Sequence, residues 1–83
     1  MTFRVEFSEL AARKFRALDK PVRERIVAKL WEVAEDPLRH LSRLRAVDAY
    51  RLRVGDYRLV VDVDEAARVV YVLTLGHRST AYR

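Results

Sequence analysis

The first residues of the chain alternate between apolar and polar side chains. Phe3, Val5 and Phe7 would lie on one side of an extended segment, with polar residues between them on the other side. This period of two is typical of a β-strand with one buried face. The pattern therefore predicts a half-buried strand over residues 2–7.

Two helical patterns follow this strand. Ser8 is a favourable helix N-cap, because its hydroxyl can accept a bond from a first-turn N–H group. Apolar residues then recur at helical spacing, at Ala11, Phe15 and Leu18. A second pattern begins near Pro21, a residue tolerated in a first turn, and stops before Pro37. Its apolar stripe consists of Val22, Ile26, Leu30 and Val33. The short connection around Asp19 predicts an antiparallel hairpin of helices.

The period of two returns at Tyr50. A strand is predicted over residues 50–54, and Gly55-Asp56 has the composition of a two-residue hairpin turn. The returning strand covers residues 57–63. A third strand over residues 69–75 completes an antiparallel meander and ends at Gly76.

Residues 38–49 are the least regular stretch, and we expect a loop there with a short strand near residues 41–44. The predicted fold class is α+β, with the order β-α-α-β-β-β, in one domain over residues 1–83. The helices are expected to cover one face of the sheet and leave the other face open. The N-terminal strand is expected to join an edge of that sheet.

Composition restricts the classes of protein that the chain can belong to. Half of the 83 residues are hydrophobic, enough for one compact core. There is no cysteine, which excludes disulfides and thiolate metal sites. The longest apolar run, residues 69–75, is far shorter than the roughly 20 residues of a membrane helix. The N-terminal pattern does not resemble a signal peptide. We therefore expect a cytoplasmic protein that does not interact with membranes.

The net charge of +5 is concentrated in the second half of the chain. Residues 1–37 hold eight basic residues against seven acidic ones, whereas residues 38–83 hold nine against five. All nine basic residues of the second half are arginines. A GC-rich genome could account for this preference, but not for the positions of the arginines. Arginine pairs bidentately with phosphate, so those positions are informative.

The two-residue turn fixes which residues face each other in the hairpin. Arg53 lies directly opposite Arg58, and Arg51 lies on the diagonal of that pair. Like charges at opposite positions are destabilising by up to about 1 kcal/mol, so stability does not explain this arrangement. An anion between the guanidinium groups would relieve the repulsion, and phosphate fits their geometry. Alternatively, the guanidinium groups turn into solvent, stack, or pair with Asp56 or Asp62.

The C-terminal tail adds further candidates for nucleic-acid binding. Arg78 follows the third strand, and Tyr82 offers an aromatic ring on which an RNA base can stack. His77 is the one side chain next to these residues that ordinarily titrates near neutrality. We interpret His40, in the irregular stretch, as solvated or structural. The sequence contains no paired carboxylates, metal-ligand cluster, glycine-rich phosphate loop or nucleophile triad, so no metal and no small-molecule cofactor are predicted.

Three segments together resemble the RelE toxins of toxin–antitoxin modules. The first is YRLRVGDYR at residues 50–58, followed by LVV, and the second is GHRSTAY at residues 76–82. The third runs from residue 5 through the helices to Pro37. The resemblance covers nearly the whole chain and is fairly specific for the RelE/ParE superfamily. It distinguishes activities within the superfamily less well, because ParE relatives share the fold and part of the hairpin.

The resemblance implies a ribosome-dependent endoribonuclease that enters the A site and cuts mRNA. Such enzymes use the RNA 2′-hydroxyl as nucleophile without metal, and leave a cyclic phosphate and a 5′-hydroxyl. Carried onto this chain, Arg53 and Arg58 would stabilise the charge on phosphorus, and Arg51 would bind the RNA backbone. Arg78 would act at the leaving 5′-oxygen, and Tyr82 would stack on a base.

The chain departs from the best-known members in two ways. Those members carry lysines at the positions of Arg51 and Arg53, and one of them is proposed as general base. Arginine stays protonated and makes a poor base. The base is therefore His77, or there is none and positioning and charge supply most of the acceleration. We also expect this protein to lack the extra C-terminal helix that some relatives carry after the position of Tyr82.

Two other functions remain open at this point. One is a ParE-like toxin that poisons DNA gyrase without cutting RNA, although the complete arginine and tyrosine set favours RelE. The other is a non-catalytic RNA-binding module kept for antitoxin binding. In each toxin reading we expect a RelB-like acidic antitoxin encoded next to this chain. It would lay a helix or extended segment across the sheet and a hydrophobic groove.

Overall fold

The computed structural model describes residues 2–45 and 48–78. In chain order the elements are β1 (Arg4–Phe7), α1 (Glu9–Arg16), α2 (Lys20–Glu35), α3 (Pro37–His40), β2 (Ser42–Arg43), β3 (Tyr50–Val54), β4 (Tyr57–Asp64) and β5 (Val69–His77). The five strands form one sheet in the order β1-β5-β4-β3-β2. The predicted α+β class and its order of elements are confirmed, and the predicted short strand near residues 41–44 is β2.

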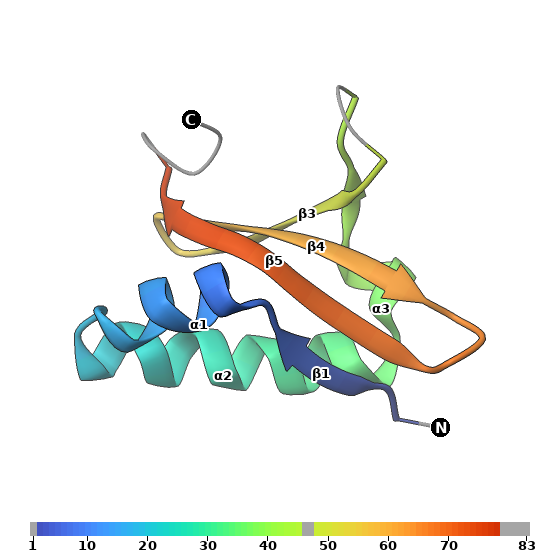
Figure 1. Cartoon of the computed structure of the whole chain (residues 1–83), viewed down its shortest axis with the longest axis horizontal. Helices are drawn as coiled ribbons and strands as arrows, with labels where there is room; N and C mark the ends of the chain where they lie inside the picture. The colour runs from blue at the N-terminus through green and yellow to red at the C-terminus, as the bar shows by residue number, and fades with distance from the viewer. Residues whose placement is uncertain (1, 46–47, 79–83) are drawn as a thin grey trace.

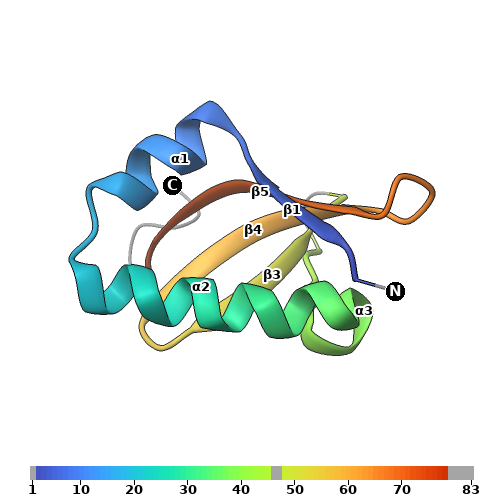
Figure 2. The same ribbon diagram turned by 90° about the horizontal axis from the view of Figure 1, so that it is seen from below.

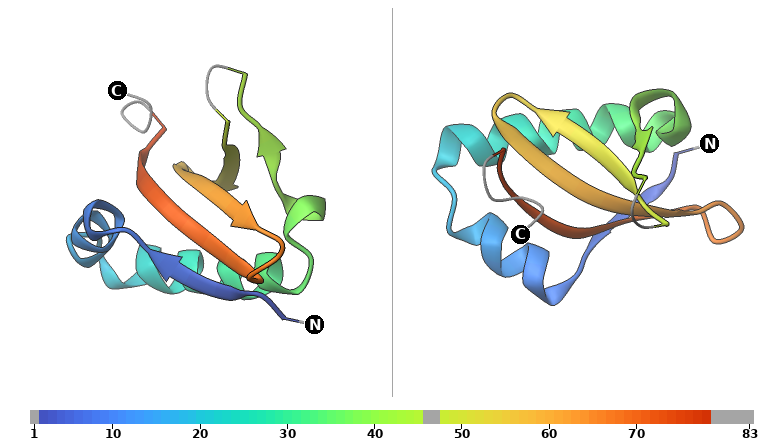
Figure 3. Two further views of the ribbon diagram at one scale, coloured as in Figure 1. Left: turned by 45° about the vertical axis from the view of Figure 1, so that its right-hand side comes forward. Right: turned by 90° about the horizontal axis from the view of Figure 1, so that it is seen from above.

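The helices lie on one side of the sheet (Figures 1 and 2). α1 packs against β5 and β1, and α2 contacts β1 and β3. The two helices run in opposite directions and diverge beneath the sheet (Figure 2). Seen from above, none of the described helices lies over the opposite face of β3, β4 and β5 (Figure 3, right). The predicted open face is therefore present.

The core lies between this sheet and the two long helices. Its members are 5% exposed or less and include Ala11, Ile26, Leu30, Val33, Leu52, Leu59, Val61, Val70, Val72 and Leu75. The predicted stripe of α2 supplies Ile26, Leu30 and Val33, whereas Val22 is only partly buried. Phe7 and Phe15 add an edge-to-face ring pair, with centroids 5.2 Å apart.

β1 is an edge strand, as predicted, and it runs parallel to β5. Ser8 connects β1 to α1 and makes two hydrogen bonds through its hydroxyl. Its Oγ accepts a bond from the Ala11 N–H group at 3.0 Å, which caps the helix. The same Oγ donates to the carbonyl of Leu73 in β5 at 2.6 Å. One side chain thus starts α1 and ties it to the sheet.

Three features of the fold differ from the sequence-based expectation. Residues 37–40 form the one-turn helix α3, where a loop was expected, since Pro37 presets the backbone angle of a first helical turn. β5 continues through Gly76 to His77, because both residues pair with β4. β5 also contains a bulge at Leu73: Val60 faces Thr74, and the next residue, Val61, faces Val72.

Candidate functional site

The open face of the β3–β4 hairpin carries three arginines. Arg53 lies across from Arg58, and Arg51 lies across from Val60, as the sequence predicted. The residues between them, Leu52 and Leu59, point to the opposite side and are almost fully buried. Arg51, Arg53 and Arg58, which we call the arginine face, are therefore held on the uncovered side of a strand pair anchored in the core.

A tight turn sets the register of this hairpin. Gly55 has a positive φ of 58°, which residues with a Cβ atom rarely adopt. Asp56 does not have a positive φ, so the turn matches the type with glycine at its first central position. This turn places Val54 across from Tyr57 and therefore Arg53 across from Arg58.

No carboxylate neutralises the arginine face in the described part of the chain. The ion pairs there are Arg4–Glu6, Lys29–Glu32 and Arg43–Asp48. The Asp62 carboxylate accepts a bond from the adjacent Val63 N–H group. Arg58 makes only a long contact of 3.5 Å, from Nη1 to the carbonyl of Tyr57. The alternative that Asp56 or Asp62 pairs with these guanidinium groups is therefore not observed.

Arg78 lies beside the hairpin turn. Its N–H group donates to the carbonyl of Asp56 at 2.7 Å, which ties the end of β5 to the turn between β3 and β4. Arg78 is exposed and lies one residue beyond β5. The backbone of Arg78 is thus held next to the hairpin turn, and its part in the site stays a prediction. Tyr82, the predicted base-stacking residue, lies outside the described residues.

His77 does not lie on the arginine face, which corrects the expectation that it joins the site. It pairs with Tyr57, and directly opposite residues of an antiparallel pair project to the same side. Tyr57 alternates with Arg58 and so projects away from the arginines. The rings of His77 and Tyr57 contact each other edge to face, with centroids 5.6 Å apart. The bulge at Leu73 causes this placement, because one extra residue inverts the alternation of β5 beyond it.

A polar pocket that the sequence did not reveal adjoins the arginine face. It has a volume of about 330 Å³ and is lined by Lys29, His40, Ser42, Arg51, Leu52 and Arg53. Its residues come from α2, α3, β2 and β3, so it lies at the outer edge of β3. His40, expected to be solvated or structural, is half-buried at this pocket. We call this cavity the edge pocket.

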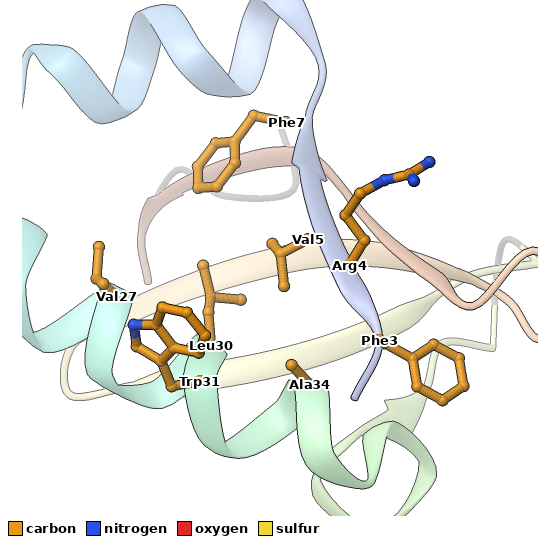
Figure 4. Close-up of a pocket in the computed structure, with 8 residues that line it drawn as sticks. All are labelled: Phe3, Arg4, Val5, Phe7, Val27, Leu30, Trp31 and Ala34. Atoms are coloured by element: carbon orange, nitrogen blue, oxygen red, sulfur yellow. The ribbon is translucent and has the colours of Figure 1, made fainter. Parts of the chain in front are cut away.

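An apolar groove lies between β1 and α2 (Figure 4). It has a volume of about 340 Å³ and is lined by Phe3, Arg4, Val5, Phe7, Val27, Leu30, Trp31 and Ala34. Trp31 is 67% exposed and Val27 is 41% exposed. Sequence reasoning missed both residues, since it considered only the buried stripe of α2.

The described residues contain no group of three or more histidine, aspartate or glutamate side chains that could hold a metal ion. Over the same residues, no helix is both long and apolar enough to cross a membrane.

Comparison with known proteins identifies the family. A sequence model described as the ParE toxin of type II toxin–antitoxin systems matches residues 5–82. The chain is also 38% identical to the mRNA interferase toxin RelE of Escherichia coli over 81 residues, which cover 94% of this chain and 85% of that protein. The chain belongs to the RelE/ParE family of toxins.

Solved structures of this family share the fold. A RelBE toxin–antitoxin complex from Mycobacterium tuberculosis superposes with a TM-score of 0.86 at 26% identity, covering 94% of this chain and all of that one. The RelE–RelB complex of Pyrococcus horikoshii gives a TM-score of 0.82 at 26% identity, covering 98% and 100% of the two chains. The intact Escherichia coli RelBE complex gives 0.76 at 36% identity, covering 90% and 95%. The predicted RelE resemblance is thereby confirmed for the family and for the fold.

Proposed function

We propose that this chain is a ribosome-dependent endoribonuclease that cleaves mRNA in the A site and thereby stops translation. The observation that carries the proposal is the arginine face, where two arginines oppose each other and have no carboxylate partner among residues 2–45 and 48–78. The relative from Escherichia coli that is 38% identical is an mRNA interferase by name. The proposed place of action is the cytoplasm, where ribosomes are found.

Substrate binding follows from the geometry of the face. The scissile phosphate binds between Arg53 and Arg58, and each guanidinium donates to a non-bridging oxygen. This contact relieves the repulsion within the pair, so the free protein is poised to accept an anion. Arg51 binds the RNA backbone further along β3. On the other side of Arg58, Gly76 contributes no side chain, which leaves the approach open.

The proposed reaction is an intramolecular transesterification without metal. The 2′-hydroxyl oxygen attacks phosphorus, the bond to the 5′-oxygen breaks, and a 2′,3′-cyclic phosphate and a 5′-hydroxyl form. The proton lost by the 2′-hydroxyl is balanced by the one that the 5′-oxygen gains. Arg53 and Arg58 stabilise the negative charge on the phosphorane, and donors arranged before the reaction are effective because they need no reorganisation. Arg78, fixed beside the turn, donates to the leaving oxygen.

The proposal assigns no protein side chain as general base. Arg51 and Arg53 remain protonated, and His77 lies on the opposite side of the sheet. Acceleration therefore comes mainly from charge stabilisation and from alignment of the 2′-hydroxyl with the leaving group. Tyr82 remains the proposed base-stacking residue, which holds the nucleotide in that alignment.

We further propose that an antitoxin encoded next to this chain holds it inactive. The solved relatives described above are toxin–antitoxin complexes. With a net charge of +5 and an unneutralised arginine face, this chain favours a partner that presents acidic residues. Such a partner inhibits by occupying the position of the RNA phosphate.

A cell-free translation reaction tests the activity. The purified toxin is added to a defined mRNA, and cuts are mapped by primer extension with and without ribosomes. We expect cuts within codons only when ribosomes are present. Arg58→Ala and Arg78→Ala should each abolish cleavage and growth arrest while leaving the circular-dichroism spectrum unchanged. Lys20→Gln, on an exposed residue at the start of α2, serves as the control.

Two results would contradict this function. Full growth arrest by Arg58→Ala or Arg78→Ala would refute the assigned residues. Intact mRNA accompanied by gyrase-dependent DNA breaks would replace the proposal with the gyrase-poisoning activity expected of a ParE-like toxin. A His77→Gln variant with an unchanged pH–rate profile would agree with the absence of a histidine base.

A further inference from the structure

The edge pocket exists because β2 is much shorter than β3. β2 contains two residues, and its pairing ends where Ser42 faces Arg51. β3 continues for three more residues, which pair with no described strand on that side. α2 runs beside β3 on the covered side (Figure 2), and the pocket in this gap is lined by Lys29 of α2 and His40 of α3.

The backbone of β3 contributes to this pocket as well as its side chains. In a two-residue hairpin, the residues that flank the turn exchange both of their hydrogen bonds, and the following pair does not. Val54 and Tyr57 flank the turn, so the N–H and carbonyl groups of Arg53 point away from β4. They point toward the edge where β2 has already ended. The pocket therefore presents a backbone N–H donor at the position of Arg53.

The charged residues of the lining are all basic. Lys29, Arg51 and Arg53 are cations, Ser42 and His40 can donate hydrogen bonds, and no lining residue is acidic. Lys29 has a carboxylate neighbour, with 3.3 Å between its Nζ and the Oε2 of Glu32, but its side chain keeps 34% exposure. Arg51 and Arg53 take part in none of the ion pairs of the described residues. Several donors around one small polar cavity fit an oxyanion with several acceptor oxygens.

We propose that the edge pocket is a second phosphate subsite, which binds the phosphodiester next to the scissile one; this inference rests on the proposed function. Arg51 and Arg53 are two residues apart on one strand, a distance of about 7 Å. That distance is close to the spacing of successive phosphates along an RNA strand. RNA therefore crosses the outer edge of β3, and Lys29, His40 and Ser42 are positioning residues rather than catalytic ones.

RNA fits this pocket better than an acidic segment of a protein partner does. Arg53 belongs to both the arginine face and the edge pocket, so one continuous strand of phosphates can satisfy both sites. The subsite also assigns a purpose to Lys29, which the catalytic step does not use. Lys29 binds the neighbouring phosphate and thereby fixes the orientation of the nucleotide whose 2′-hydroxyl must align with the scissile bond.

The test compares RNAs with different numbers of phosphates. Binding of the full-length protein is measured by fluorescence anisotropy with two labelled, 2′-O-methylated RNAs that cannot be cleaved: a dinucleotide with one internal phosphate and a hexanucleotide with five. Lys29→Gln and His40→Ala are compared with Lys20→Gln, a change on the same helix that lies away from the pocket. Circular dichroism checks that each variant is folded.

We expect Lys29→Gln to weaken hexanucleotide binding about tenfold, the effect of one charge-assisted contact. It should change dinucleotide binding less than twofold. The slope of log affinity against log salt concentration for the hexanucleotide should fall by about 0.7, as expected for one lost phosphate contact on a single strand. Lys20→Gln should change none of these quantities.

Equal weakening of both RNAs, or no difference from Lys20→Gln, would overturn the subsite. So would a Lys29→Gln variant that binds RNA normally and binds the antitoxin more weakly, because the pocket would then serve the protein partner. These outcomes are independent of the proposed function, which fails instead if the unaltered protein cuts no mRNA on ribosomes. Even then, a larger loss of hexanucleotide binding than of dinucleotide binding in Lys29→Gln would still support the subsite.

Discussion

Arg53 and Arg58 face each other on an exposed strand pair, where like charges repel. Functional sites often retain residues that lower stability, because activity needs them there. In this protein the unfavourable pair is also the proposed binding site of the scissile phosphate. The same two side chains therefore lower the stability of the free protein and raise its affinity for an anion.

This arrangement predicts that removing one arginine of the pair makes the protein more stable and less active. Arg53→Gln should raise the free energy of unfolding by up to about 1 kcal/mol, because it removes the cross-strand repulsion. The same variant should lose mRNA cleavage. Urea denaturation followed by circular dichroism measures the first effect, and the gain should shrink at high salt as screening weakens the repulsion.

Arg13→Gln is the matched control for this experiment, since Arg13 is an exposed arginine of α1 away from the hairpin. Its effect on stability should stay within about 0.5 kcal/mol. A clear loss of stability in Arg53→Gln would mean that the guanidinium groups stack favourably rather than repel.

The placement of individual residues was predictable where a turn fixes the register. Gly55-Asp56 determined that Arg53 faces Arg58, and the structure agrees. His77 was not predictable in the same way. Its side of the sheet depends on the bulge at Leu73, where the alternation of β5 shifts by one residue, and the local sequence of β5 carries no sign of that shift. Leu75 and His77 therefore both project to the side of the sheet that faces the core.

Among the elements, α1 depends most on a single polar contact. Ser8 caps the helix through the Ala11 N–H group and donates to the carbonyl of Leu73 at the bulge. Helix capping and sheet geometry are therefore coupled at one hydroxyl. Removal of the Ser8 hydroxyl leaves α1 without its cap and removes one hydrogen-bond donor to the Leu73 carbonyl.

We therefore predict that Ser8→Ala lowers the free energy of unfolding by about 1–2 kcal/mol. Ser8→Thr keeps the hydroxyl and should lose much less. Urea denaturation of the three proteins provides the measurement. An Ser8→Ala variant as stable as the unaltered protein would show that water replaces both bonds at little cost.

Long elements could be predicted from periodicity, and short ones could not. The stripe of α2 and the alternation of β3 and β4 extend over enough residues to define a period. α3 has four residues and β2 has two, so neither contains a full repeat of its pattern. The position of β2 is set instead by the edge of β3 to which it pairs. The edge pocket depends on these two short elements, which explains why the sequence did not reveal it.

At the scale of the whole molecule, the surface has one basic region and one apolar region, which lie on different elements. The uncovered side of the sheet carries the arginine face, whereas the groove between β1 and α2 is mainly apolar. The fold class and the open face followed from the order of elements. The apolar groove did not, because it depends on residues of α2 outside its buried stripe, such as Trp31.

The concentrated charge predicts a strong salt dependence of RNA binding. With three arginines on the face and Arg78 beside it, log affinity for a single strand should fall with log salt concentration with a slope of about −2 to −3. Anisotropy titrations with the uncleavable hexanucleotide at increasing salt measure this slope. A slope near zero, or the same slope after replacing Arg51 and Arg53 by glutamine, would contradict electrostatic binding at this face.

Trp31 is the only tryptophan of the chain, and it is 67% exposed on the wall of the apolar groove. The protein therefore contains one tryptophan fluorophore, whose emission can be excited apart from that of the four tyrosines, and it lies away from the arginine face. A partner that covers the groove moves this indole out of water and shifts its emission to shorter wavelength. RNA bound over β3 and β4 leaves the spectrum as it was. Unlabelled protein can thus report, from a single spectrum, which of its two surfaces is occupied.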